Sequence, residues 1–154
     1  MIPMSRPPSS AGTPPSVPAV DVATMQAMVD AAPYHRLVPL VVEEVDASIG
    51  RFVLRLPFDT SLTRLAESDQ VHGGPIASVI DTAGTFAVMA IVGHGVPTMN
   101  LRIDYLRPAV GTDLVATAVV RRAGRTAAVC DVDLHDGEGR LVAVGRGTWA
   151  TAAG

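Results

Sequence analysis

A single carboxylate stands inside the most apolar part of the chain. Asp81 is the only ionisable side chain between Gly73 and Gly93, in a segment built mainly of Ala, Val, Ile, Gly and Met. The dipole of a helix that starts near Gly73 does not explain it, because that effect fades within the first turn. Burying a carboxylate without partners costs free energy. Asp81 is therefore either part of a hydrogen-bond network that fixes the packing or a catalytic carboxylate beside a pocket.

Two glycines precede this segment, in the sequence Val71-His72-Gly73-Gly74. A helix that begins here presents free backbone N–H groups and the positive end of its dipole, and glycine lets a ligand approach the backbone closely. The Gly73 N–H would then polarise a carbonyl group whose carbon Asp81 attacks directly or through water. The alternative is an ordinary glycine-rich turn before a helix.

The spacing of these two groups predicts an assembly. At about 1.5 Å of rise per residue, a helix separates Gly73 from Asp81 by about 12 Å, too far for the pair in one chain to hold one reacting carbon. A shared site, with the glycine from one subunit and the aspartate from its partner, removes the difficulty. We therefore expect a homodimer with active sites built by both subunits.

The segments before this pair predict one helix and two strands. Asp21 is a suitable N-cap for a short helix that runs to about Ala32. Strand patterns follow over residues 37–46 and 51–58, and residues 59–71 are interpreted as a polar loop.

The segments after it complete an α+β fold. The apolar stretch predicts a helix from Pro75, at its first position, to Val92, with Gly93 as the stop. Four strands follow, joined by turns typical of hairpins, over residues 98–106, 113–122, 126–135 and 141–150. A helix that is apolar on all sides has to be enclosed. We expect a four-strand meander and the two earlier strands to form an antiparallel sheet wrapped around it.

Length and composition restrict the classes of protein. With 154 residues one domain is expected, and a net charge of −3 argues against a nucleic-acid binder. Residues 1–20 hold half of the 12 prolines and predict a disordered tail before a domain over residues 21–154. Asp81 opposes membrane insertion of the apolar helix. Cys130, the single cysteine, has no metal-ligand spacing around it, and no secretory signal is visible, so we expect a cytoplasmic protein without metal or cofactor.

Taken together, these residues resemble a known family. His72-Gly73-Gly74, Asp81 and residues 100–108 (NLRIDYLRP) are similar to motifs of the hotdog-fold acyl-CoA thioesterases, nearest to the phenylacetic-acid-degradation type. Residues 141–148 are similar to the last strand of that family, and the resemblance covers roughly residues 35–150. It implies a long helix wrapped by an antiparallel sheet, homodimers with two shared sites that often pair into tetramers, and hydrolysis of an acyl-CoA substrate without a metal.

The resemblance also implies roles for single residues. Gly73 matches the backbone donor to the thioester oxygen, and Asp81 matches the nucleophile or general base. Thr85 matches a position that orients the attacking water in some relatives, although a helical threonine can equally bond back to the carbonyl of residue 81. His72 is either a general acid for the leaving thiol or a residue that orders the start of the helix.

One position departs from the family pattern. Many relatives carry an asparagine six residues before the histidine of the His-Gly-Gly motif, and this chain has Ala66 there. Either a neighbour such as Gln70 substitutes for the asparagine, or catalysis is weaker than in relatives that have it.

Arginines near the predicted strand ends are candidates for binding the phosphates of coenzyme A, because guanidinium groups pair well with phosphate. With Gly74, the candidate substrate-binding residues are Arg102, Arg107, Arg121, Arg122 and Arg125. The alternative is that these exposed arginines only keep the sheet soluble. We expect an acyl-CoA thioesterase; a non-catalytic acyl-CoA-binding protein and a hotdog-fold hydratase or dehydratase are the alternatives, and the acyl group stays open.

Overall fold

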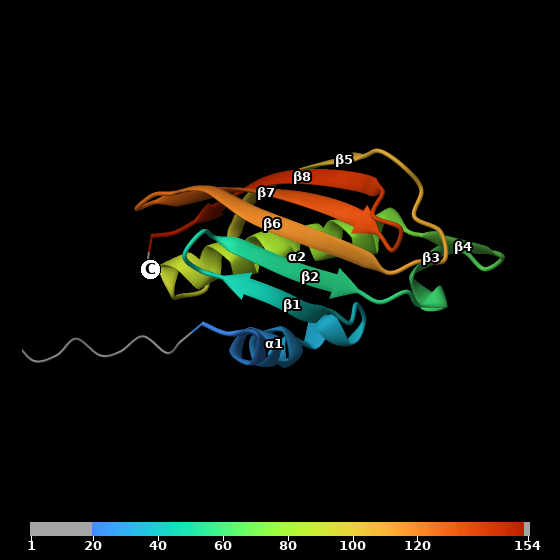
Figure 1. Ribbon diagram of the computed structural model, residues 1–154, viewed down its shortest axis with the longest axis horizontal. Coiled ribbons are helices and arrows are strands. Elements are labelled where there is room, and N and C mark those ends of the chain that lie inside the picture. The colour runs from blue at the N-terminus through green and yellow to red at the C-terminus, as the bar shows by residue number, and fades with distance from the viewer. Residues whose placement is uncertain (1–19, 153–154) are drawn as a thin grey trace, which may run out of the picture.

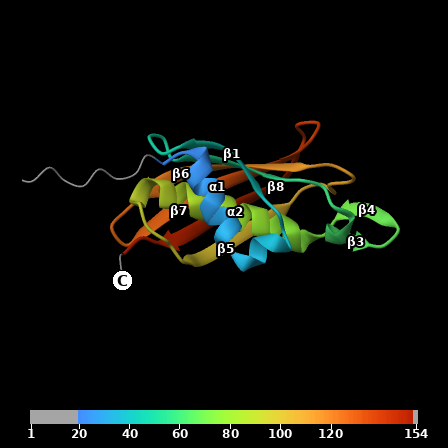
Figure 2. The ribbon, with the colours of Figure 1, turned by 90° about the horizontal axis from the view of Figure 1, so that it is seen from below.

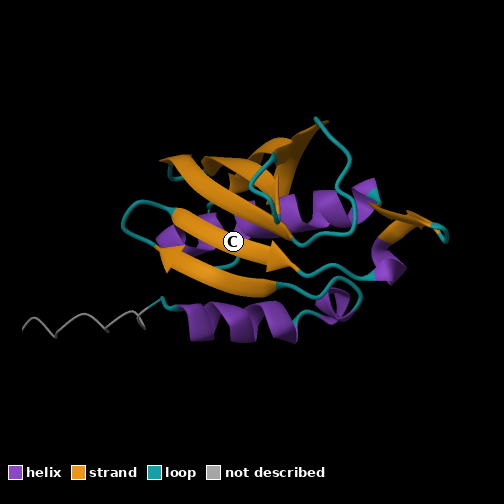
Figure 3. Cartoon of the chain, turned by 45° about the vertical axis from the view of Figure 1, so that its right-hand side comes forward, coloured by secondary structure: helices purple, strands orange, loops and turns teal. Residues whose placement is uncertain are grey.

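An antiparallel sheet of six strands curves around one long helix, α2 (Gly73–Val92), in the computed structural model (Figure 1). The structure describes residues 20–152, so the predicted tail lies outside it except for Val20. The view from below shows both helices in front of the sheet (Figure 2), and the six strands of this sheet form one curved layer (Figure 3). The predicted α+β architecture is confirmed.

The order of the strands differs from a simple meander. The strands are β1 (Val41–Asp46), β2 (Arg51–Leu56), β5 (Thr98–Tyr105), β6 (Leu114–Ala123), β7 (Ala127–Asp136) and β8 (Leu141–Ala150). They lie in the order β1-β2-β6-β7-β8-β5, so β6, β7 and β8 form a meander, and β5 pairs with β8 at the edge. The predicted hairpin between β5 and β6 is wrong.

The segment after β2 explains why that hairpin does not form. It contains the short 3-10 helix η2 (Thr60–Leu62) and the two-stranded hairpin of β3 (Thr63–Leu65) and β4 (Ser68–Val71). The connection after β5 bonds to β4: Ala109 accepts from the Val71 N–H at 2.9 Å, and Gly111 donates its N–H to Asp69 at 3.0 Å. The prediction of a loop over residues 59–71 is also wrong, because the segment is polar and its short strands lack an apolar alternation.

The N-terminal helix forms as predicted. α1 (Val22–Ala31) starts after Asp21, whose side chain accepts a hydrogen bond from the Thr24 N–H at 2.8 Å. The 3-10 helix η1 (Pro33–Arg36) follows directly. α1 lies along β1 (Figure 1), and the Gln26 side chain both donates to the Leu40 carbonyl and accepts from the Val42 N–H. α1 therefore fixes the start of the outer strand.

Small residues let α2 approach the sheet. Trp149 of β8 is fully buried, and a Cβ atom added to Gly84 of α2 or to Gly147 of β8 would overlap its ring. A Cβ atom on Gly145 would likewise overlap Ile80. α2 is long and apolar enough to cross a membrane by length and composition, but half of its most apolar window is buried inside this fold. It is the core helix that the sequence predicts.

Candidate active site

The start of α2 is set by a histidine cap. The His72 Nδ1 atom accepts a hydrogen bond from the Gly74 N–H at 2.9 Å. The helix therefore begins at Gly73, and Pro75 is its third residue and not its first as predicted. Proline fits there because the first four N–H groups of a helix have no partner within the helix. The structure places His72 in the helix-ordering role that was one of its two interpretations.

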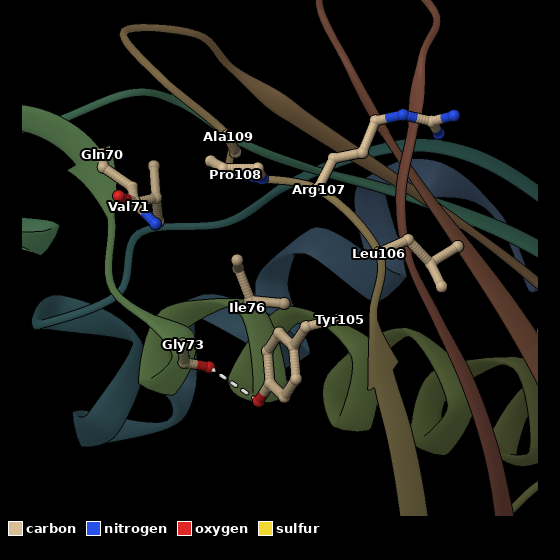
Figure 4. A pocket seen from close by; sticks show the side chains of 9 residues that line it. All are labelled: Gln70, Val71, Gly73, Ile76, Tyr105, Leu106, Arg107, Pro108 and Ala109. Carbon is tan, nitrogen blue, oxygen red and sulfur yellow. Dashed lines mark hydrogen bonds between the residues drawn. The ribbon is translucent and has the colours of Figure 1, made fainter.

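The chain around Gly73 is held by bonds from three other segments. The His72 N–H donates to the Leu62 carbonyl at 2.8 Å, and the Val71 N–H donates to the Ala109 carbonyl. The Tyr105 hydroxyl donates to the Gly73 carbonyl at 3.1 Å (Figure 4). Within residues 20–152 the Gly73 N–H has no acceptor of its own. It is the group at this helix start that is available to a ligand oxygen.

A cavity of about 330 Å³ adjoins Gly73. Figure 4 shows its lining: Gln70, Val71, Gly73, Ile76, Tyr105, Leu106, Arg107, Pro108 and Ala109. Ala66 lies in the turn between β3 and β4 and is not part of the lining, whereas Gln70 is. The Arg107 guanidinium points away from Gly73 and donates to the Leu141 carbonyl at 2.6 Å.

Asp81 lies on the side of α2 that the sheet leaves uncovered. It is half-buried in the single chain. The Thr98 hydroxyl, at the start of β5, donates to Asp81 Oδ1 at 2.8 Å, which leaves the second carboxylate oxygen unbonded among the described residues. Thr98 was not among the predicted site residues, because a threonine at the start of a strand has no distinguishing pattern in the sequence.

Two cavities meet at Asp81. The first, of about 280 Å³, is lined by Ala77, Ser78, Asp81, Thr98 and Leu101. The second, of about 350 Å³, extends toward η1 and is lined by Tyr34, His35, Ser78, Asp81, Thr82, Thr85 and Phe86. Hydroxyl groups are common in both linings, and the Tyr34 and Ser78 hydroxyls bond to each other at 2.5 Å. Asp81 is thus accessible to a small molecule from either side.

Thr85 joins this site to the core. Its hydroxyl oxygen accepts a hydrogen bond from the buried indole N–H of Trp149 at 2.8 Å. Its observed partner is therefore Trp149 and not the carbonyl of residue 81. The proton of the Thr85 hydroxyl stays available to the second cavity, which this residue lines.

The five candidate arginines do not form one cluster. Arg102 and Arg121 share a hollow of about 560 Å³ with Arg146, on the face of the sheet turned away from α2. Asp131 bonds to Arg121 and Arg146 there, and the hydrogen bond from Arg146, followed by that from Arg121, lowers the pKa of the Asp131 carboxyl. Arg122 and Arg125 lie at the β6–β7 turn and have no ion pair within residues 20–152.

Two further features bear on metal and thiol chemistry. Among the described residues, no group of three or more His, Cys, Asp or Glu side chains could hold a metal ion.

Burial raises the pKa of the Cys130 thiol to about 12, which keeps it protonated and unreactive at neutral pH.

Comparison with known proteins assigns the family. A putative esterase of Halobacterium salinarum is 43% identical over 115 residues, which is 68% of this chain and 76% of the relative. The thioesterase superfamily profile matches residues 70–143. The chain belongs to the thioesterase superfamily.

Two further comparisons of this superfamily member support the same assignment. Human acyl-coenzyme A thioesterase 13 is 32% identical over 108 residues, covering 68% of this chain and 75% of the relative. The solved structure of the E. coli PaaI protein, from the phenylacetic acid degradation operon, has a TM-score of 0.74 at 27% identity, over 83% of this chain and 90% of that chain. The predicted resemblance is confirmed: this superfamily member is a hotdog-fold thioester hydrolase of the PaaI type.

Proposed function

We propose that this protein hydrolyses acyl-CoA thioesters, with Asp81 and the Gly73 N–H as its catalytic groups. The observation that carries the proposal is the state of two groups of the chain within residues 20–152. The N–H groups next to the Gly73 N–H are bonded while that N–H is not, and Asp81 has one oxygen held by Thr98 and one left unbonded. A donor and a carboxylate of this kind suit acyl transfer. The similarity to human acyl-coenzyme A thioesterase 13 supports the same substrate class.

In the proposed reaction the Gly73 N–H donates to the thioester oxygen as negative charge develops on it. The free oxygen of Asp81 removes a proton from a water that attacks the carbonyl carbon, or attacks that carbon itself to form an anhydride that water then cleaves. The Thr85 hydroxyl orients the water. The carbon–sulfur bond breaks, the thiolate of coenzyme A leaves and is protonated, and the free acid remains. Water is the co-substrate, and we propose no cofactor.

We further propose that two copies complete each site. β5 is one of the two edge strands of the sheet, and its exposed apolar side chains include Met99 and Tyr105. An unpaired edge of this kind readily accepts another strand. Pairing through β5 would place a second copy next to the uncovered side of α2, where Asp81 lies. Asp81 and Gly73 from different subunits would then meet the same thioester.

For coenzyme A, we propose Arg122 and Arg125 ahead of the other three arginines. Arg102 and Arg121 are paired with carboxylates, and Arg107 is bonded to a backbone carbonyl. Unpaired guanidinium groups can take a phosphate without giving up an existing ion pair.

The test is release of free coenzyme A from a panel of aryl-, short-chain and medium-chain acyl-CoA thioesters. We expect turnover by the wild-type protein and a loss of at least about a hundredfold in kcat for Asp81→Asn, with an unchanged fold by circular dichroism. Hydrolysis at the wild-type rate by Asp81→Asn would refute the mechanism. Binding without turnover would favour a non-catalytic acyl-CoA-binding protein, and hydration of an enoyl-CoA would favour the hydratase alternative.

A further inference from the structure

The peptide group between Gly73 and Gly74 is held at both ends. Its carbonyl oxygen accepts from the Tyr105 hydroxyl at 3.1 Å, and its N–H donates to His72 Nδ1 at 2.9 Å (Figure 4). Two consecutive glycines are the most flexible pair that a backbone can have. Both glycines belong to the first turn of α2, which already restricts this peptide plane, and the two side chains hold it further at the end where a helix frays.

The contact from Tyr105 includes its ring. A Cβ atom on Gly73 would lie 3.5–3.6 Å from ring and hydroxyl atoms of Tyr105, which is ordinary van der Waals contact. Tyr105 is the last residue of β5 and is 54% exposed. In the single chain its hydroxyl could therefore bond to water, so burial within the chain does not force the bond to Gly73.

We propose that Tyr105 is a positioning residue for the donor at Gly73. The Gly73 N–H belongs to the preceding peptide, and the His72 N–H bond to the Leu62 carbonyl holds the chain on that side. The Tyr105 hydroxyl holds the peptide that follows Gly73, so the two bonds together limit the direction in which the Gly73 N–H points. The inference rests on the proposed function, because it assigns the Gly73 N–H to the thioester oxygen. Donors that are already oriented stabilise a developing charge best, and a displacement of about 1 Å can cost a large factor in rate.

The test is Tyr105→Phe, which keeps the ring and removes the hydroxyl. We expect kcat for phenylacetyl-CoA to fall about tenfold while KM stays within about twofold, since the loss concerns the transition state. The matched control is Ser48→Ala, which removes another hydroxyl hydrogen bond, from Ser48 to the Asp46 carboxylate in the exposed β1–β2 turn, a turn that carries none of the proposed site residues. The control should keep the wild-type kcat.

A spectroscopic measurement separates positioning from general stability. In an Asp81→Asn background, phenylacetyl-CoA labelled with ¹³C at the thioester carbonyl should show an infrared carbonyl band shifted to lower frequency on binding, and Tyr105→Phe should move it back toward the value in water. Unchanged kcat and an unchanged band in Tyr105→Phe would overturn the inference, as would an equal loss of kcat in Ser48→Ala. If the wild-type protein hydrolyses no thioester, the proposed function fails. The infrared carbonyl band of the bound thioester still shows whether Tyr105 positions the Gly73 N–H.

Discussion

At the scale of single residues, the site depends on how one carboxylate is held. Asp81 Oδ1 accepts from Thr98 at 2.8 Å, so the carboxylate plane is fixed by a residue of the neighbouring strand and not by α2. A hydrogen bond to a charged group is worth about 1.5–3 kcal/mol. Thr98 is therefore the side chain whose removal should disturb Asp81 most directly without replacing it.

Thr98→Val should lower kcat about tenfold, because the charged carboxylate loses its donor and its fixed orientation. Thr98→Ser keeps the hydroxyl and should retain most of the activity. Steady-state hydrolysis of one acyl-CoA by the three proteins makes the comparison. Equal kcat values for the Val and Ser variants would show that Thr98 does not orient Asp81.

At the scale of elements, the contact between α2 and β8 positions the site. The Trp149 ring occupies the space that Gly84 and Gly147 leave open, and its indole N–H holds Thr85 one turn beyond Asp81. The rotation of α2 about its own axis is thereby fixed, which determines where Asp81 points. Gly84 and Gly147 are needed for packing, because they leave room for the Trp149 ring. Gly73 and Gly74 matter for the backbone at the start of α2.

Gly84→Ala should destabilise the fold. Alanine improves helix propensity by about 1 kcal/mol, but overpacking against a rigid buried ring costs typically about 1–3 kcal/mol and moves Trp149. Thermal unfolding should show a lower Tm for this variant. Gly95→Ala is the matched control, because a Cβ atom there meets no atom within 4 Å. A Tm for Gly84→Ala at or above the wild-type value would contradict the packing argument.

The outer face of the sheet adds a dependence on pH. The pKa of Asp131 is lowered in the folded state, first by Arg146 and then by Arg121. Its contribution to stability is therefore fully present above the unfolded-state pKa, near 3.9, and is lost as the pH falls through the lower folded-state value. Asp131→Asn should lower the free energy of unfolding at pH 7, and the difference from the wild type should shrink below about pH 4. A difference independent of pH would exclude this linkage.

At the scale of the whole molecule, the proposed sites require two subunits. Gly73→Pro removes the N–H and adds a ring whose Cβ would lie in ordinary contact with Tyr105. The backbone accommodates it, since proline suits the first helical position and His72, at φ −66° and ψ 150°, already has the conformation favoured before proline. A Gly73→Pro subunit and an Asp81→Asn subunit each lack one half of the chemistry. Their heterodimer would contain one complete site.

Mixing these two inactive variants, with unfolding and refolding to exchange subunits, should restore about a quarter of the wild-type activity, because half of the randomly formed dimers are mixed and each holds one intact site of two. Free coenzyme A release measures the recovery, and each variant refolded alone is the control. No recovery in a mixture that size-exclusion chromatography shows to be dimeric would place Gly73 and Asp81 of one chain in the same site.

The parts of this fold that are predictable from sequence are those with a strong local signal. The apolar helix, its stop at Gly93 and the alternation of β7 are of this kind. Gly73 and Asp81 also stand out in the sequence, and their catalytic roles stay a prediction. The position of β5 beside β8 was not predictable. Turn residues such as those at 108–111 indicate where the chain bends, but they do not determine which strand the next strand pairs with. Thr98 and Tyr105 were missed as contacts of the site for a related reason: their partners lie 17 and 32 residues away in the chain.

The place of Tyr105 at the end of β5 has a mechanical consequence. β5 is supported along one side by β8, and its other side has no strand beside it in the single chain. A second strand paired to the open side would make β5 more rigid. The Gly73–Gly74 peptide, which the Tyr105 hydroxyl holds, would then become more rigid as well. Association of two chains would then change the catalytic rate of each chain through the rigidity of its own backbone at Gly73. This effect would add to that of any residue contributed by the partner.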